Sequence, residues 1–400
     1  MRTYELIHAD CRDVMANMGD DSVDAVCTDP PYHLASIVKR FGPGQAPQQF
    51  GTDGAYARAA RGFMGQTWDG GDIAFDADLW REVLRVLKPG GFLLAFSGTR
   101  TYHRMAVAIE DAGFEIRDML EWIYGSGFPK GSVVDGRGPA LKPAHEPICM
   151  ARKPFRGSIA RNVALHGTGA LNIDACRIAG EPVARIAHDA SSSSATPGYG
   201  GGLAGGSRTD PHTAGRFPAN VLHDGSDEVV VQFPIDAGAN SKASGPSLRT
   251  ESASVAMRPF AGLPDGVEPQ FHGDQGSAAR FFYCAKASKR DRDEGCEHLP
   301  PQPAGMVSEN SGPHLTRRDE GYEVAARANH HPTVKPTPLM RWLCRLVTPP
   351  GGIVFDPFTG SGSTGKAALL EGLRFLGAEM TADYIPIARA RMDWALARAA

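Results

Sequence analysis

The sequence lacks a strong net charge, paired cysteines and long apolar runs, and each absence excludes a class of protein. Its 42 Lys and Arg nearly balance its 45 Asp and Glu, and the net charge of −3 excludes a uniformly basic nucleic-acid-binding protein. The seven cysteines are scattered without a C-x-x-C pair, which argues against a disulfide framework or a structural zinc site and fits a reducing cytosol. We find neither a signal peptide nor ~18 consecutive apolar residues, so we expect no membrane segment.

Strand and helix patterns alternate over residues 1–152. Apolar runs predict buried strands, at residues 4–9, 23–27, 92–96, 114–124 and 145–151. Helical spacing of apolar residues predicts helices between them, at residues 11–18, 77–87 and 102–113. Repeated alternation of this kind predicts an α/β fold with a parallel sheet flanked by helices.

This pattern breaks between residues 153 and 329. The stretch contains runs of serine and glycine at 191–194, 200–202 and 205–206, which predict a loop-rich insertion with small islands of order. Residues 128–220 carry eleven Lys and Arg against six Asp and Glu, a local charge of +5. That charge fits a DNA-binding face and an ordinary solvated surface equally well.

Order resumes over residues 330–400. Helices are predicted at 339–347, 365–372 and 384–396, and strands at 353–355 and 375–379. The result is a β-α-β-α unit, which we expect to complete the sheet begun at the N-terminus.

A glycine-rich turn, Phe358-Thr359-Gly360-Ser361-Gly362-Ser363-Thr364, follows a predicted strand and opens a helix. Glycines let the backbone turn tightly and approach a ligand, while free N–H groups at the helix start face it. Glu379 ends the next strand, where a carboxylate can accept hydrogen bonds from both hydroxyls of a ribose. Together these features indicate a site for an adenosine-bearing cofactor.

Two other interpretations of this turn stay open. Gly360-Ser361-Gly362-Ser363-Thr364-Gly365-Lys366 satisfies the G-x-x-x-x-G-K pattern of a phosphate-binding P-loop, which would indicate a nucleotide hydrolase. Ala367 stands where a P-loop needs Ser or Thr to hold magnesium, and this argues against that class. The other interpretation is a structural glycine turn without a ligand.

A second motif, Asp29-Pro30-Pro31-Tyr32, also follows a buried strand. Two prolines stiffen the backbone and remove donors, so the Asp29 carboxylate and the Pro30 carbonyl offer two acceptors in fixed geometry. Such a pair can hold both hydrogens of an amino group and aim its nitrogen at an electrophile. The Tyr32 ring can stack on a flat base, a contact worth ~1–3 kcal/mol. An ordinary surface turn is the alternative.

The two motifs together resemble those of the amino-methylating DNA methyltransferases. Residues 331–336 (His-Pro-Thr-Val-Lys-Pro) and 7–11 (Ile-His-Ala-Asp-Cys) are similar to two further motifs of this family. The catalytic motif precedes the insertion and the glycine turn follows it, which is the order of the β group. The resemblance implies a Rossmann-like S-adenosylmethionine-dependent methyltransferase sheet with an inserted, loop-rich target-recognition region. Its parts would be a catalytic half at 1–152, the insertion at 153–329 and a cofactor-binding half at 330–400.

The resemblance also implies site residues and a reaction. The enzyme would flip a base out of duplex DNA, and the amine would attack the methyl group of S-adenosyl-L-methionine without a metal. The catalytic residues would be Asp29, Pro30, Pro31 and Tyr32, with Asp29 orienting the amine more than acting as a base. The cofactor-binding residues would be Asp10, Cys11, Asp29, Thr333, Lys335, Asp356, Phe358, Gly360, Ser361, Gly362, Ser363, Thr364 and Glu379. Within this set, Thr333 and Lys335 are expected at the methionine carboxylate and Asp10 on the adenine side, although an acid at a strand end is also a common helix cap.

The target base is expected to be adenine. Family members that methylate cytosine N4 tend to carry Ser before the proline pair, whereas adenine N6 enzymes usually carry Asp, as at Asp29. Cytosine-N4 methylation and an inactive DNA-binding homologue remain alternatives. Double-stranded DNA is the expected partner, in a bacterial cytoplasm or nucleoid or from a phage gene. The resemblance allows a homodimer, and the sequence does not indicate whether a partner endonuclease exists.

Overall fold

The structure is a computed structural model that divides the chain into two compact units. It describes residues 3–32, 72–127, 135–138, 140–180, 183–188, 206–212, 215–235, 237, 276–285, 288–303 and 326–398. The first unit comprises Met1–Cys176, Asn220–Ser226 and Cys284–Ala400, and the second comprises Arg177–Ala219 and Asp227–Tyr283. Parts of the insertion expected at 153–329 therefore belong to the first unit. The division does not test what these parts do, so the role of 153–329 in target recognition stays a prediction.

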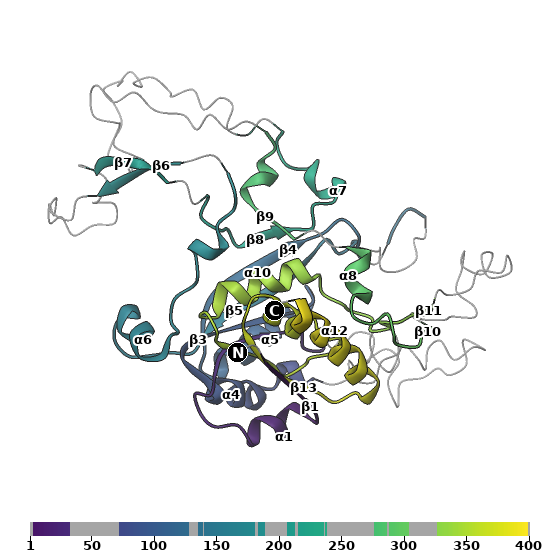
Figure 1. The fold of residues 1–400 in the computed structure, drawn as a ribbon. Helices are drawn as coiled ribbons and strands as arrows, with labels where there is room; N and C mark the ends of the chain where they lie inside the picture. The colour runs from purple at the N-terminus through teal and green to yellow at the C-terminus, as the bar shows by residue number, and fades with distance from the viewer. Residues whose placement is uncertain are drawn as a thin grey trace. The chain divides into compact units, whose positions relative to one another are not determined.

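The first unit contains a nine-stranded sheet in the order β1-β13-β12-β2-β3-β5-β4-β8-β9 (Figure 1). Its strands are β1 (Tyr4–His8), β2 (Val23–Thr28), β3 (Leu87–Phe96), β4 (Glu115–Ile123), β5 (His145–Arg152), β8 (Val221–His223), β9 (Tyr283–Cys284), β12 (Ile353–Asp356) and β13 (Arg374–Glu379). Every strand predicted from residues 1–152 is present. The α/β, Rossmann-like fold expected from the sequence is confirmed.

The sheet is mixed, so the expectation of a purely parallel sheet is wrong at β5. The run β1-β13-β12-β2-β3 is parallel throughout. By contrast, β5 is antiparallel to both of its neighbours, β3 and β4. A parallel return needs a crossover, usually a helix, and the described residues between β4 and β5 form none. The chain therefore reverses after β4, and β5 inserts between β3 and β4.

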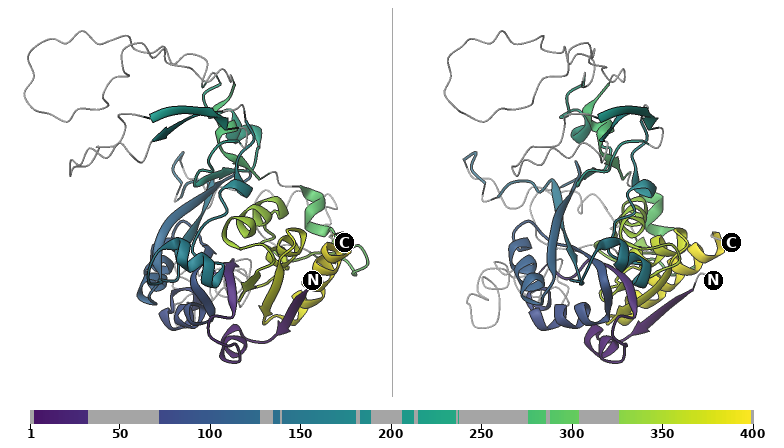
Figure 2. Two further views of the ribbon diagram at one scale, coloured as in Figure 1. Left: turned by 60° about the vertical axis from the view of Figure 1, so that its left-hand side comes forward. Right: turned by 90° about the vertical axis from the view of Figure 1, so that its left-hand side faces the viewer.

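Helices cover both faces of this sheet (Figure 2). They are α1 (Cys11–Ala16), α4 (Ala77–Val86), α5 (Tyr102–Asp111), α6 (Ile159–His166), α8 (Lys289–Asp293), α10 (Thr337–Val347), α11 (Ser363–Leu370) and α12 (Ile385–Arg398). On one face α4 packs against α1 and α5, and on the other α11 packs against α10 and α12. Short 3-10 turns η3 (Ile73–Phe75), η4 (Asp174–Cys176) and η6 (Ala382–Tyr384) and the two-stranded pair β10 (Gln302–Pro303) with β11 (Ala326–Arg327) complete the unit.

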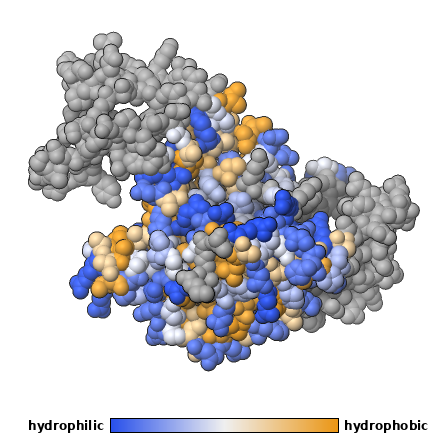
Figure 3. All heavy atoms as spheres, in the orientation of Figure 1, coloured by the Kyte–Doolittle hydropathy of each residue, from blue (hydrophilic) through white to orange (hydrophobic). Residues whose placement is uncertain are grey.

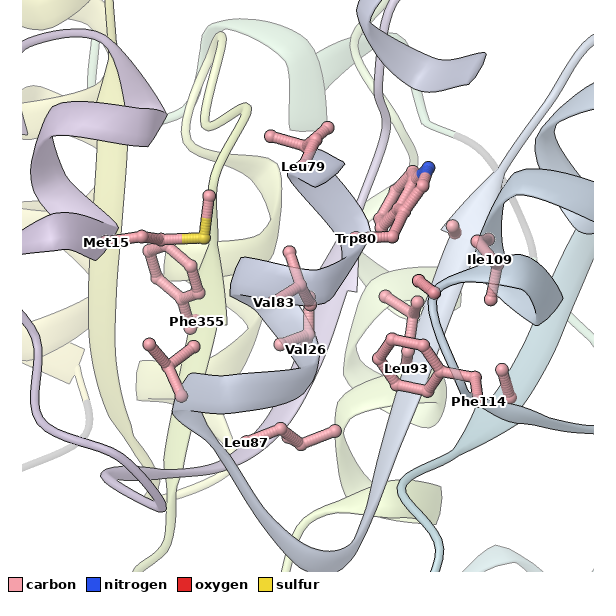
Figure 4. Packing of buried hydrophobic residues seen from close by; sticks show 14 of the residues in the cluster. Met15, Val26, Leu79, Trp80, Val83, Leu87, Leu93, Ile109, Phe114 and Phe355 are labelled. Atoms are coloured by element: carbon pink, nitrogen blue, oxygen red, sulfur yellow. The ribbon is translucent and has the colours of Figure 1, made fainter. Parts of the chain in front are cut away.

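Apolar side chains of α4 fill the space between the helices and the sheet (Figure 4). Trp80 and Val83 are fully buried, and they pack with Val26 of β2 and Leu93 of β3. Burial of a large apolar side chain contributes about 1.5–3 kcal/mol. The i, i+3, i+4 spacing of the apolar residues of α4 places them on one face, which is the pattern that predicted this helix.

The C-terminal β12-α11-β13-α12 unit joins the N-terminal strands in one sheet, as predicted. Strand β13 pairs with β1 on one side and with β12 on the other, and β12 pairs with β2. Because these strands are parallel, their carboxyl ends meet at one edge of the sheet. Segments from opposite ends of the sequence are thereby brought together there.

The second unit is small and has little regular structure. It contains an antiparallel pair, β6 (Val183–His188) and β7 (Gly206–His212), a short helix α7 (Asp227–Val230) and a 3-10 turn η5 (Ala278–Phe281). The guanidinium groups of Arg216 and Arg280 lie 4.5 and 4.4 Å from the centre of the Phe281 ring. These contacts give the unit a small ordered centre.

The surface of the first unit shows one group of exposed apolar side chains on α6. Ile159 and Leu165 are 50% and 67% exposed. The region of α6 at the left of Figure 3 contains orange, apolar spheres. Elsewhere on this face polar and apolar side chains are mixed (Figure 3). Among the described residues, no helix has both the length and the apolar character to cross a membrane.

Candidate active site

A cleft opens at the carboxyl ends of β1, β2, β12 and β13. It encloses about 900 Å³ of space between atoms, part of it open to solvent. All the expected cofactor-binding residues line it except Gly362. Of the catalytic motif, Asp29 and Pro31 line the cleft, whereas Pro30 and Tyr32 do not.

The glycine turn between β12 and α11 needs glycine at two positions. Gly360 and Gly362 have φ of +51° and +74°, in the left-handed region that side chains disfavour. A Cβ on Gly360 would come within 2.8 Å of His331 Nε2, and a Cβ on Gly362 within 2.9 Å of the Ala388 Cα. Gly362 is the N-cap residue of α11, so the helix starts immediately after the turn. The turn therefore presents backbone to the cleft, as a ligand cradle requires.

Glu379 ends β13 and closes one side of the cleft. Its Oε2 accepts from the Gly360 N–H at 2.7 Å and its Oε1 from the Thr381 N–H at 2.7 Å. The side chain is buried, and burial raises the pKa of its carboxyl above the ordinary value. Each carboxylate oxygen has a second lone pair, so two further hydrogen bonds can form on the cleft side.

Asp356 ends β12 and lies at the floor of the cleft. Its Oδ1 accepts from Thr28 Oγ1 at 2.6 Å and from the Phe358 N–H at 3.0 Å. Only 2% of the residue is exposed, and burial raises the pKa of the carboxyl to about 6, against the opposing effect of hydrogen bonds from Thr28 and Thr364. A buried carboxylate with a perturbed pKa in a cleft is a common feature of functional sites.

Asp29 follows β2 and forms an ion pair with Lys335. Its Oδ2 lies 2.8 Å from Lys335 Nζ. Its Oδ1 is buried and has no hydrogen-bond partner among the residues that the structure describes. Burial raises the pKa of the Asp29 carboxyl, and the net direction stays upward although Lys335 lowers it. A buried acceptor without a partner costs about 1–3 kcal/mol, so Oδ1 is a candidate for a ligand hydrogen.

Lys335 also contacts a second carboxylate and the tyrosine of the catalytic motif. Its Nζ lies 3.0 Å from Glu146 Oε2 and 3.1 Å from the Tyr32 hydroxyl oxygen. The Tyr32 hydroxyl in turn donates to Glu146 Oε2 at 3.2 Å. Burial lowers the pKa of the Lys335 ammonium, but Asp29 and Glu146 outweigh this effect and raise it. Lys335 was expected at the cofactor carboxylate, and the structure places it on Asp29 while leaving it in the cleft wall.

The remaining expected residues have local roles as well as a place in the cleft wall. Asp10 is the N-cap of α1, and its Oδ1 accepts from the Arg12 N–H at 2.8 Å. Cys11 is buried, and burial raises the pKa of its thiol to about 12, so the thiol is inert as a nucleophile at neutral pH. The Thr333 N–H donates to His331 Nδ1 at 3.3 Å.

The lysine that suggested a P-loop faces away from the cleft. The Lys366 side chain is fully buried, and its Nζ lies 2.8 Å from Asp291 Oδ1 and 3.0 Å from Glu294 Oε2. It does not line the cleft and is not available to a phosphate there. Together with Ala367 in place of Ser or Thr, this geometry argues against a nucleotide hydrolase. Among the described residues there is also no cluster of His, Cys, Asp and Glu that could hold a metal ion.

Two residues of the site carry no recognisable signal in the sequence. Glu146 lies within β5, and nothing in the surrounding sequence distinguishes it from an ordinary strand residue. Arg391 is fully buried in α12, and its Nη1 donates to the Ser361 carbonyl at 2.8 Å and to Ser363 Oγ at 2.9 Å. Only the packing of distant segments reveals that these charges support the cleft.

The chain is similar to known proteins over different parts of its length. A family model described as DNA methylase matches residues 23–390. Over 64 residues the chain is 41% identical to the DNA adenine methyltransferase YhdJ of Escherichia coli (strain K12), which is 16% of this chain and 22% of that protein. Over 71 residues it is 41% identical to the type II methyltransferase M2.DpnII of Streptococcus pneumoniae, which is 18% of this chain and 26% of that protein.

A solved structure, the cytosine-N4-specific PvuII DNA methyltransferase, is 14% identical with a TM-score of 0.43. The match covers 98% of this chain and 86% of that one. The two curated relatives are thus matched over about a quarter of their lengths, 22% and 26%.

Proposed function

This chain belongs to the DNA methylase family, and from that membership we propose that it transfers a methyl group from S-adenosyl-L-methionine to the N6 amine of adenine in double-stranded DNA. The order of its motifs, with Asp29-Pro30-Pro31-Tyr32 before the insertion and the glycine turn after it, is that of the β group of amino-methylating enzymes. The observation that carries the proposal is the position of Asp29. Asp29 lines the same cleft as the glycine turn and Glu379, and its Oδ1 has no hydrogen-bond partner in the described part of the chain.

The cofactor cleft suits S-adenosylmethionine. Gly360 of the turn lines the cleft, and without a side chain its backbone can approach a ligand closely. Glu379 would accept hydrogen bonds from the ribose hydroxyls, and Asp356 with Phe358 would lie at the methionine part. The buried carboxylates favour a cation, which fits a sulfonium. When bound, S-adenosylmethionine supplies an electrophilic methyl group on a positively charged sulfur.

The catalytic motif would orient the amine. Asp29 Oδ1 would accept one amine hydrogen and the Pro30 carbonyl the other, so that the nitrogen lone pair points toward the methyl group. Tyr32 would stack on the flipped base. The amine nitrogen would form the new bond to the methyl carbon, the electron pair of the broken bond would stay on sulfur, and the surplus proton of the nitrogen would pass to solvent. Asp29 acts here by position and charge.

Adenine is proposed over cytosine because of Asp29. In the family that the motifs resemble, adenine N6 enzymes carry Asp at this position and cytosine N4 enzymes tend to carry Ser. The curated relative YhdJ is named a DNA adenine methyltransferase, which supports the same choice. We further propose that residues 153–329 recognise the DNA sequence.

Mass spectrometry of DNA nucleosides tests this proposal. DNA from cells that express the chain should contain N6-methyladenine, and Asp29→Ala should abolish it. Asp111→Ala removes an exposed carboxylate at the end of α5 and is the matched control, with methylation unchanged. Detection of N4-methylcytosine alone would overturn the choice of adenine and leave amino-methylation in place.

A further inference from the structure

Four polar side chains from three separate segments meet beside the cleft. Asp29 and Tyr32 follow β2, Glu146 lies in β5, and Lys335 precedes α10. Lys335 Nζ is 2.8 Å from Asp29 Oδ2 and 3.0 Å from Glu146 Oε2, so one ammonium is shared by two carboxylates. Only 7% of the Lys335 side chain is exposed, against 20% for Asp29 and 21% for Glu146. The lysine is the buried centre of the cluster.

The cluster has an excess of negative charge. Burial and the two carboxylates raise the pKa of the Tyr32 hydroxyl well above its ordinary value, so the phenol is neutral. Two carboxylates and one ammonium then sum to a charge of −1 when both acids are ionised. If Glu146 were absent, Lys335 would neutralise Asp29 completely. Glu146 therefore determines both how Lys335 is shared and the charge that faces the cleft.

We propose that Lys335 and Glu146 are positioning residues for the methyl transfer. Lys335 holds Asp29 through Oδ2 and leaves Oδ1 free to accept from the amine, while Glu146 shares Lys335 and keeps the cluster negative. This inference rests on the proposed function. During the transfer, positive charge moves from the sulfur to the amine nitrogen, and a fixed negative charge beside that nitrogen stabilises the transition state.

Of the described residues, Tyr124 and His331 also lie near Lys335, and neither provides this charge. Tyr124, at the end of β4, is neutral because burial and Glu146 raise its pKa to about 12. His331 is neutral because burial and the neighbouring cations lower its pKa to about 3. Asp356 also faces Asp29, and among the described residues its hydrogen-bond partners are Thr28, Thr364 and Phe358 rather than Lys335 or Glu146. Changes at Lys335 and Glu146 therefore act on Asp29 first.

Removing the two positioning residues should shift the ionisation of Asp29 in opposite directions. In Lys335→Met the attractive charge is lost, the pKa of Asp29 rises, and the acidic limb of kcat against pH should move to higher pH. In Glu146→Gln the repulsive charge is lost, the pKa of Asp29 falls, and the acidic limb should move to lower pH. We expect each shift to be about one pH unit. A residue that only supported the fold would produce no such opposition.

The measurement is methyl transfer to duplex DNA from tritiated S-adenosylmethionine by the full-length protein, as a function of pH. Glu146→Gln should also lower kcat about tenfold at neutral pH, with the KM for S-adenosylmethionine within about threefold, because charge near the amine is lost and the cofactor cleft is retained. Lys335→Arg keeps the charge and should restore the acidic limb to its wild-type position. Glu110→Gln and Arg81→Met, both at exposed positions, are the matched controls.

A second measurement does not depend on turnover. Carbon-13 NMR of protein labelled at the aspartate carboxyl carbons follows Asp29 directly, with Asp29→Asn used to assign its signal. Opposite shifts of its pKa in Lys335→Met and Glu146→Gln support the inference. Shifts in the same direction, or none in either variant, overturn it. Absence of methyl transfer to DNA by the wild-type protein would instead overturn the proposed function, even if the NMR shifts were found.

Discussion

Two buried lysines of this protein each bridge two carboxylates, yet their surroundings differ. Lys335 joins Asp29 and Glu146 in the wall of the cleft, and Lys366 joins Asp291 and Glu294 away from it. The Lys366 cluster stabilises the fold, whereas the Lys335 cluster can still form a hydrogen bond with a ligand.

The two aspartates make this difference explicit. Both oxygens of Asp291 are bonded, Oδ1 by Lys366 and the Thr337 hydroxyl and Oδ2 by the Thr337 N–H at 2.5 Å. Burial would raise the pKa of Asp291, but these bonds outweigh it and lower the pKa. Asp29 is also paired with a lysine, but its pKa is raised and, among the described residues, its Oδ1 has no hydrogen-bond partner. A satisfied carboxylate stabilises the fold, whereas an unsatisfied one is a candidate for function.

The largest expected effect is the loss of stability when Lys366 is removed. Lys366→Met leaves Asp291 and Glu294 without their common cation, and we expect the free energy of unfolding to fall by about 3–5 kcal/mol. Lys335→Met should cost less, because the side chains of Lys335 and Asp29 are 7% and 20% exposed, against 0% and 10% for Lys366 and Asp291. Urea denaturation followed by circular dichroism measures both, with Lys142→Met as the exposed control. An equal loss in the two variants would contradict the distinction.

The next largest expected effect is the loss of methyl transfer when the charge of Asp29 is removed. Asp29→Asn keeps the shape of the side chain and removes its charge, so we expect kcat for methyl transfer to fall about 10²–10³-fold. The affinity for S-adenosylmethionine, measured by isothermal titration calorimetry, should change by less than about threefold because the glycine turn and Glu379 are intact. A loss of cofactor binding as large as the loss of kcat would mean that Asp29 serves the cofactor rather than the amine.

Asp356 provides a test in which stability and function oppose each other. Its pKa is raised to about 6 in the folded protein, so the fold favours the protonated acid. Stability should therefore fall as pH rises from the unfolded pKa of about 3.9 toward 6, and remain lower above it. Asp356→Asn removes this cost and should be more stable than wild type at pH 7 by up to about 3 kcal/mol, while binding S-adenosylmethionine less tightly.

Thermal unfolding at pH 4 and pH 7 checks the prediction for Asp356. The advantage of Asp356→Asn should be small at pH 4 and larger at pH 7. An advantage that did not grow with pH would show that the pKa of Asp356 is not raised by the fold.

The smallest expected effect concerns the support of Tyr32. Thr101 Oγ1 donates to the Tyr32 carbonyl at 2.9 Å. Thr101→Val keeps the size of the side chain and removes this bond, at a cost of about 1 kcal/mol, or about fivefold in kcat/KM for DNA. Steady-state kinetics with a fixed duplex measures it. An unchanged kcat/KM would mean that the backbone after the two prolines is rigid enough without Thr101.

The sequence predicted the elements of the sheet better than their directions. Periodic apolar residues identify helices such as α4 and strands such as β2, because burial of one face decides the local structure. They do not report strand direction, which depends on the connection, and so the expectation of a parallel sheet is wrong at β5. The joining of the C-terminal unit to β1 and β2 was predicted, since a short β-α-β-α unit needs partners for its edges.

The cofactor side of the site was predicted in more detail than the ionic network behind it. The glycine turn, Asp356 and Glu379 occupy characteristic positions at strand ends, and the structure places them around one cleft. Glu146 and Arg391 act through packing of segments that are far apart in the sequence, so no local pattern identifies them. The contact of Lys335 with Asp29 likewise depends on how two loops meet, which spacing along the chain does not determine.

The central claim is that Asp29 orients a DNA amine for methyl transfer at this cleft. The most direct test uses the purified protein, duplex DNA and S-adenosylmethionine that carries a deuterated methyl group, followed by mass spectrometry of the nucleosides. The account predicts deuterium-labelled N6-methyladenine with the wild-type protein and with Asp111→Ala, and none with Asp29→Ala. Unlabelled DNA in the wild-type reaction, or equal labelling by Asp29→Ala, would contradict it.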